Sequence, residues 1–163
     1  MTRIALLSDT HGYICQGMLE HIARCDEVWH AGDIGSMSVI DAIKLLKPLR
    51  AVWGNIDGTD IKQLFPKFNA FNIEGLNVLI THIGGYPGRY DSEVISILRQ
   101  NPPKLLVCGH SHILKVMSDK TNNLLYMNPG AAGKYGFHLK RTMILFDIDG
   151  GECKDLRIVE WDK

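Results

Sequence analysis

Residues 3–12 read RIALLSDTHG, an apolar run that ends in a serine, a carboxylate and an imidazole. A continuous apolar run of this length is typical of a strand buried on both faces, as in a parallel sheet covered by helices. Between residues 13 and 24 the apolar side chains recur at helical intervals. The opening stretch therefore predicts a strand, a loop and a helix, with Asp9 and His11 in the loop.

The same unit recurs along the first third of the chain. We expect strands at residues 27–30 and 50–53, with a helix at 38–46 between them, which gives a βαβαβ pattern with parallel strands. The rest of the chain favours antiparallel pairing. We expect a hairpin of residues 70–73 and 76–81, a helix at 92–101, and further strands at 105–108, 113–118, 124–127, 142–147 and 153–160. Two mixed sheets packed face to face, with helices outside, accommodate this order in one domain spanning residues 1–163.

Composition limits the classes of partner. The 163 residues are 45% apolar and 22% charged, which is close to a globular average. Lys and Arg number 18, as do Asp and Glu, and no basic run is present, so charge favours neither nucleic-acid nor membrane partners. The four cysteines form no C-x-x-C pair and no export signal is visible, so we expect reduced thiols and a cytoplasmic location.

Polar side chains follow five of the predicted strands, each beside a glycine. They are Asp9 and His11, Asp33, Asn55 and Asp57, His82, and His110 and His112. Because ligands of open α/β sheets bind outside the carboxyl ends of the strands, we expect these five loops to converge.

Each loop alone has a simpler interpretation. Asp9 could cap a helix, Asn55 could occupy a turn, the GHSH segment at 109–112 could be a turn, and a lone His82 is more often a core histidine whose hydrogen bonds are satisfied. The argument for a site is the coincidence, since independent turns have no reason to share Asp, Asn and His after every strand.

This set of side chains suits a metal centre. Imidazole, carboxylate and amide ligands, without a cysteine ligand, suit divalent first-row metals such as Mn, Fe, Co, Ni or Zn. Seven of these residues, all except Asp57, are candidate ligands and are too many for one ion, since zinc typically takes four. They fit two ions if one carboxylate bridges, and Asp33 is the natural bridge. Two cations about 3.5–4 Å apart clamp a phosphoryl group and lower the pKa of a shared water.

In this order, the motifs D-x-H, G-D, G-N, H and G-H-x-H resemble those of the calcineurin-like metallophosphoesterase superfamily. The forms SDTHG, HAGD, GNID and GHSH, followed by NPG at residues 128–130, resemble its small bacterial and archaeal phosphodiesterase branch. The resemblance covers nearly the whole chain. It implies a four-layer αββα sandwich with the site at the strand ends.

The resemblance also implies two divalent metal ions, with Mn²⁺ expected first and Ni²⁺, Fe, Co²⁺ or Zn²⁺ as alternatives. The first ion would be held by Asp9, His11, Asp33 and His112, and the second by Asp33, Asn55, His82 and His110. The implied reaction is phosphoester hydrolysis, above all of phosphodiesters, by attack of a metal-bridging hydroxide on phosphorus. The substrate would be a small phosphoester.

One position departs from the wider superfamily, in which a histidine usually follows the asparagine and protonates the leaving group or contacts phosphate. Here the residue is Ile56, which does neither, so we expect a preference for good leaving groups. We place Asn55, His82 and Asp57 in the catalytic set. Asp57 would orient a ligand such as His11 or His82, unless it is a turn residue before Gly58.

A second class of function is a protein-binding scaffold, because the same small fold resembles the Vps29 subunit of retromer. The isoleucine at position 56 favours a scaffold, whereas the intact ligand set favours an enzyme, since buried charges without a metal are costly. Exposed strand edges permit a dimer or a tetramer.

Other polar residues are weaker candidates for the site. Arg89 would contact substrate phosphate or be a solvated loop residue, His30 would end a strand, and His21 and His138 would be structural.

Overall fold

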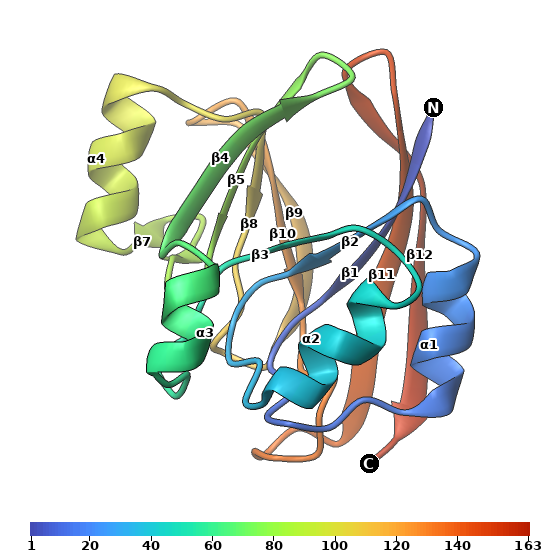
Figure 1. Cartoon of the computed structure of the whole chain (residues 1–163). Helices are drawn as coiled ribbons and strands as arrows, with labels where there is room; N and C mark the ends of the chain where they lie inside the picture. The colour runs from blue at the N-terminus through green and yellow to red at the C-terminus, as the bar shows by residue number, and fades with distance from the viewer.

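The computed structural model describes residues 1–163 and contains two five-stranded sheets packed face to face, with helices on their outer sides (Figure 1). The first sheet has the order β12-β11-β1-β2-β3 and consists of β1 (Thr2–Leu7), β2 (Glu27–His30), β3 (Leu49–Ala51), β11 (Lys140–Asp149) and β12 (Glu152–Asp162). The second has the order β4-β5-β8-β10-β9 and consists of β4 (Phe68–Ile73), β5 (Leu76–Thr81), β8 (Leu105–Val107), β9 (Leu114–Asp119) and β10 (Leu124–Pro129).

Both sheets are mixed. In the first, β1, β2 and β3 run parallel, and β11 pairs antiparallel with both β1 and β12. In the second, β5, β8 and β10 run parallel, while β4 and β9 pair antiparallel at the two edges. The predicted βαβαβ unit, the β4–β5 hairpin and the αββα fold class are therefore confirmed.

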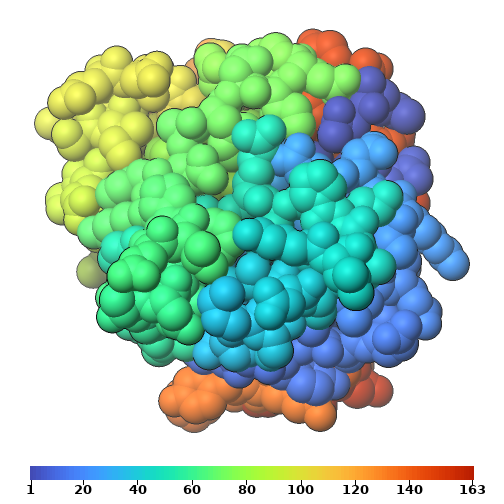
Figure 2. All heavy atoms as spheres, in the orientation of Figure 1, coloured from blue at the N-terminus to red at the C-terminus, as the bar shows by residue number.

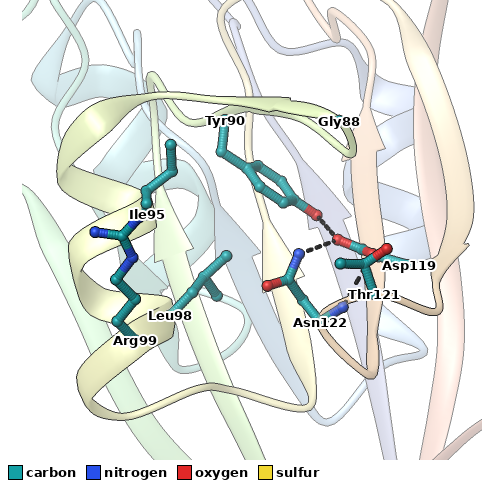
Figure 3. Close-up of a pocket in the computed structure, with 8 residues that line it drawn as sticks. All are labelled: Gly88, Tyr90, Ile95, Leu98, Arg99, Asp119, Thr121 and Asn122. Atoms are coloured by element: carbon teal, nitrogen blue, oxygen red, sulfur yellow. Dashed lines mark hydrogen bonds between the residues drawn. The ribbon is translucent and has the colours of Figure 1, made fainter.

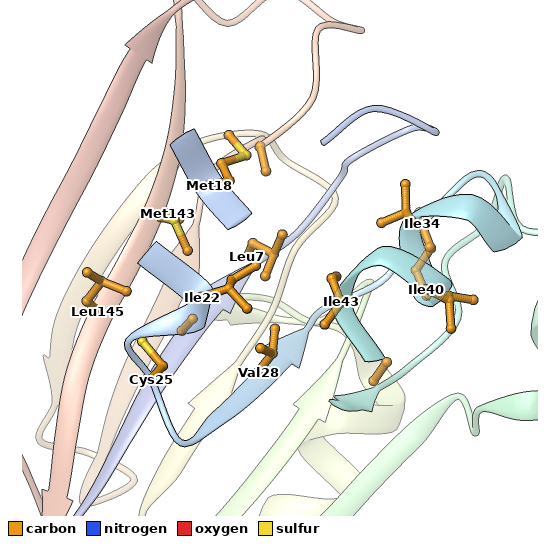
Figure 4. Close-up of a cluster of buried hydrophobic side chains, with 14 of the residues drawn as sticks. Leu7, Met18, Ile22, Cys25, Val28, Ile34, Ile40, Ile43, Met143 and Leu145 are labelled. Carbon is orange, nitrogen blue, oxygen red and sulfur yellow. The ribbon is translucent and has the colours of Figure 1, made fainter. Parts of the chain in front are cut away.

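Alternation along the strands builds the layers, because successive side chains point to opposite faces of a sheet. In β1, Ile4 and Leu6 lie in the core between the two sheets, whereas Ala5 and Leu7 face the helices. That outer face is covered by α1 (Gln16–Ala23) and α2 (Met37–Lys44), whose buried side chains meet it in Figure 4. On the far side, α4 (Ser92–Gln100) packs Val94 against the outer face of the second sheet.

Two short elements were not predicted. The helix α3 (Thr59–Leu64) and the hairpin of β6 (Gly85–Tyr86) and β7 (Arg89–Tyr90) are too short to show a period in the sequence. Figure 2 shows α2 and α3 side by side on one face of the molecule, with the segment near residues 130–140 at its lower edge. None of the helices has the length and apolar character needed to cross a membrane.

A buried histidine fixes the loop after β2. The His30 side chain has no exposed surface, and its Nδ1 accepts a hydrogen bond from the Gly32 N–H at 3.1 Å. Its Nε2 therefore carries the proton and donates to Thr10 Oγ1 at 2.9 Å, and Thr10 donates in turn to the Ile34 carbonyl. Burial lowers the pKa of His30 to about 3, so the ring stays neutral. His30 thus joins the loops after β1 and β2 and does more than end a strand.

The contacts of Asp57 contradict the prediction that it orients His11 or His82. Its carboxylate is 4% exposed and accepts hydrogen bonds from the backbone N–H groups of Ile34, Gly35 and Gly54, at 2.8–3.1 Å. It has no hydrogen bond to His11 or His82, so it orients neither ring directly. Asp57 acts on the backbone instead, by fastening the loop after β3 to the loop after β2.

Replacing Asp57 with Ala should lower the free energy of unfolding by about 3 kcal/mol, since buried N–H groups would lose a charged acceptor. Urea unfolding in the presence of EDTA measures this loss without any contribution from bound metal. Asp41 on the exposed face of α2 offers the matched control, and Asp41→Ala should change the value by less than about 0.5 kcal/mol. Equal stability of Asp57→Ala and wild type would contradict this role for the carboxylate.

Candidate metal centre

The predicted ligand loops meet at one end of the two sheets, where backbone hydrogen bonds join them. The Asp9 N–H donates to Gly32 O at 2.9 Å, and the Gly109 N–H donates to His82 O at 3.0 Å. The segment after β10 closes the same end, because the Gly133 N–H donates to Asp9 O at 3.1 Å. In Figure 1 this orange segment lies at the lower edge, beneath both sheets. The positions of the candidate side chains are thus fixed by both sheets.

The backbone of the candidate ligands is strained. Five of the eight non-glycine residues with positive φ are Asp9, His11, Asp33, His110 and His112, at 46–69°. This left-handed conformation costs an L-residue roughly 1–2 kcal/mol. Such strain persists only where the surroundings enforce it, and it concentrates at functional sites.

One group of side chains centres on Asp9. Its Oδ1 lies 3.1 Å from His112 Nε2 and 3.8 Å from His11 Nε2. Its other oxygen accepts hydrogen bonds from Ser8 Oγ at 2.6 Å and from the His110 N–H at 3.1 Å. Asp9 is fully buried and therefore presents one fixed oxygen to two imidazoles.

A second group centres on His82, whose Nε2 lies 3.2 Å from Asp33 Oδ2 and 3.1 Å from Asn55 Oδ1. His110 Nδ1 reaches the same amide oxygen, at 3.1 Å. The Nδ1 of His82 bonds the Ala31 carbonyl at 2.7 Å, which fixes the ring and directs Nε2 into the group. His82 is buried, whereas Asn55 and His110 are exposed, so the group opens to solvent on their side.

Asp33 connects the two groups through one oxygen. Its Oδ2 lies 3.2 Å from His82 Nε2 and 3.5 Å from His11 Nε2. Its Oδ1 is turned away and accepts a hydrogen bond from the Ile56 N–H at 3.1 Å. A glycine is required beside it, because a Cβ at Gly54 would lie 2.1 Å from Asp33 Oδ1.

The cluster is electrostatically coupled. Burial alone would raise the pKa of Asp9, but its contacts with His11 and His112 outweigh burial and hold the pKa far below its usual range. Burial would likewise lower the pKa of His82, but the hydrogen bond to Asp33 and the charge of Asp9 raise it. Burial and the neighbouring His82 lower the pKa of His110. The buried Asp9 carboxylate thus stays anionic, which favours positive charge beside it.

The donor set fits two divalent ions. Asp9, His11 and His112 present ligand atoms within 4.8 Å of one another, and so do Asp33, His82 and His110. Asp9 Oδ1 and His11 Nε2 are buried and have no hydrogen-bond partner in the protein. Buried polar atoms are normally paired, so these two have the character of metal ligands.

Two further residues support the ligands, and the sequence drew attention to only one of them, Asn128 in the NPG motif. Asn128 donates to Gly109 O at 2.9 Å and to Ser111 Oγ at 3.1 Å, and so holds the loop of the last two histidines. The Tyr135 ring lies over His11, with centroids 4.9 Å apart. A signal for Asn128 was present in the NPG motif, but nothing in the sequence distinguished Tyr135.

The remaining candidates lie outside the two groups. Arg89 is exposed in β7, and His21 packs its ring against Trp161. His138 is nearer, with its ring centroid 5.2 Å from that of His112 and its Nε2 bonded to the Gly133 carbonyl. A separate cavity of about 350 Å³ beside α4 contains none of the ligands. A hydrogen bond joins two residues of its lining, Tyr90 and Asp119 (Figure 3).

Comparison with known sequences agrees with this chemistry. The family model of the calcineurin-like phosphoesterase superfamily domain matches residues 2–151. A probable metallophosphoesterase of Methanocaldococcus jannaschii is 26% identical over 163 residues, covering 96% of this chain and 82% of that protein. A second, from Methanothermobacter thermautotrophicus, is 26% identical over 137 residues, covering 78% of this chain and 76% of that protein.

Solved structures show the same fold at lower identity. A structure described as a novel archaeal phosphodiesterase has a TM-score of 0.78 at 22% identity and covers 98% of this chain and 99% of its own. Vps29 of Chaetomium thermophilum has a TM-score of 0.77 at 14% identity, with both chains fully covered. Vps29 of Entamoeba histolytica in complex with zinc has a TM-score of 0.75 at 18% identity, covering 98% of each chain. Because the family model spans most of its length, this chain belongs to the calcineurin-like phosphoesterase superfamily.

Proposed function

We propose that this protein is a phosphodiesterase that uses two divalent metal ions, with Mn²⁺ as the first candidate. The observation that carries the proposal is the position of Asp33 Oδ2, which faces His11 on one side and His82 on the other. The first ion would be held by Asp9, His11, Asp33 and His112. The second would be held by Asp33, Asn55, His82 and His110.

When bound, the ions would offset the negative charge of a phosphoester and activate water as the nucleophile. The protein's own contribution is preorganisation. Ser8 and the Ala31 carbonyl fix Asp9 and His82 before any ligand arrives. Asn55 would be a neutral ligand that adds an oxygen donor without further negative charge, and its exposed side chain would face an entering substrate.

The structure provides no proton donor at position 56. The Ile56 side chain is 48% exposed at the rim, and only its backbone N–H takes part in the site, through Asp33. The side chain at position 56 would therefore not protonate the leaving group as it departs.

A second candidate function is a protein-binding scaffold, favoured by the apolar side chain at position 56 and by the fold shared with Vps29. The two candidates differ in whether metal-dependent turnover occurs. An enzyme is the stronger proposal, because each group brings three candidate ligand atoms within 4.8 Å of one another.

Bis-p-nitrophenyl phosphate should be hydrolysed with Mn²⁺ and not with EDTA. His82→Ala should lower kcat/KM by more than about 100-fold, since even the outer partners of metal ligands are worth roughly 10–100-fold. His21→Ala, a histidine on α1 away from the site, should leave the rate within about twofold. Absence of turnover with Mn²⁺, Ni²⁺, Co²⁺, Fe²⁺ and Zn²⁺ alike would favour the scaffold.

The rate should depend steeply on the leaving group. Across a series of aryl phosphodiesters, kcat should fall as the pKa of the leaving phenol rises, because no side chain at position 56 protonates it. Ile56→His should flatten this dependence and raise kcat for the poorest leaving group by about tenfold or more. Equal rates of wild type on p-nitrophenyl and alkyl esters would show that another residue supplies the proton.

A further inference from the structure

Apolar side chains surround the polar site. Each of three candidate ligands is followed directly by an exposed isoleucine, namely Ile56 after Asn55, Ile83 after His82 and Ile113 after His112. Single exposed apolar residues are ordinary, but a group of them beside a binding site indicates contact with an apolar partner.

Two of these isoleucines line a hollow of about 530 Å³ that begins at His110. Ile83 and Ile113 share its wall with Tyr86 and Tyr126, and Gly84, Gly85 and Gly109 contribute backbone without side chains. The hollow is therefore continuous with the second group of ligands and largely apolar at its walls.

Regular structure holds these walls in place. Tyr126 in β10 is buried and donates to the Gly85 carbonyl at 2.7 Å, which ties the β6–β7 hairpin to the second sheet. Lys115 in β9 holds its Nζ 4.9 Å from the centroid of the Tyr86 ring, a cation–π contact across the hollow. Tyr86 is 44% exposed, so it offers an aromatic surface to a ligand.

We propose that this hollow binds an aromatic ring carried by the phosphoester, with the phosphoryl group at the metal ligands and the ring against Tyr86. The inference rests on the proposed function and specifies its substrate class as aromatic phosphoesters. An aromatic substituent gains both from burial against Ile83 and Ile113 and from ring packing on Tyr86. The ring could belong to a simple aryl group or to a nucleobase.

A second hollow of about 480 Å³ adjoins the first and shares His110, Ser111 and Ile113 with it. Its other lining includes His112, Tyr135, Phe137 and His138. It is the weaker candidate, because the loop of residues 133–138 forms much of its wall and Phe137 is fully exposed. Phe137, which lines only this second hollow, provides the matched control for the substitution of Tyr86.

Phosphonates test the inference without turnover, because their C–P bond is not hydrolysed. Titration calorimetry of the Mn²⁺-loaded protein should show phenylphosphonate binding about tenfold more tightly than methylphosphonate. Tyr86→Ala should reduce this preference to about twofold or less and leave the Kd of methylphosphonate unchanged. Tyr86→Phe should keep the preference, and so should Phe137→Ala. An adenosine 5′-phosphonate that binds more tightly than phenylphosphonate would identify the ring as a nucleobase, and weaker binding would identify a simple aryl group.

Metal-dependent binding of methylphosphonate with no gain from the phenyl ring would overturn this inference and leave the proposed function standing. Loss of the preference in Phe137→Ala, and not in Tyr86→Ala, would also overturn it. A phenyl preference without turnover in the hydrolysis assay would instead contradict the proposed function and support the aromatic site. If neither phosphonate binds in a Mn²⁺-dependent way, the result would contradict both the aromatic site and the proposed function.

Discussion

The site depends on the orientation of one carboxylate. Asp33 turns Oδ1 to the Ile56 N–H, and this leaves Oδ2 facing His11 and His82. That orientation requires two loops to meet in a fixed register, with a glycine at position 54 because any Cβ there would clash with Asp33. Asp57 supplies the register by accepting from both loops. A single oxygen thereby faces imidazoles from loops of both sheets, His11 after β1 and His82 after β5.

The backbone geometry of the site lowers the stability of the fold locally. Five candidate ligands adopt left-handed backbone, which opposes folding. The core between the sheets and the two helix-covered outer faces offset these costs by hydrophobic burial. Rigid strands then end in strained loops, which is how a small chain holds a preorganised site at its edge.

Much of this was predictable from the sequence. Apolar runs identified the parallel strands, helical spacing identified three helices, and the polar residues at the strand ends identified the seven residues that the structure brings together. Local pattern could not reveal α3 or the β6–β7 hairpin, which are too short to have a period. It also misjudged Asp57, because a carboxylate bound by backbone N–H groups has no partner that a sequence motif can show. His30 ends β2 as predicted, but its hydrogen bond to Thr10 in the loop after β1 was not predicted, because the two residues lie far apart in the sequence.

The most direct test of the account is anomalous diffraction from crystals grown with Mn²⁺. We expect two peaks about 3.5–4 Å apart, one beside Asp9, His11 and His112 and one beside Asn55, His82 and His110, with Asp33 Oδ2 between them. A single peak, or two peaks without Asp33 between them, would contradict the bridging role of this carboxylate and with it the central claim.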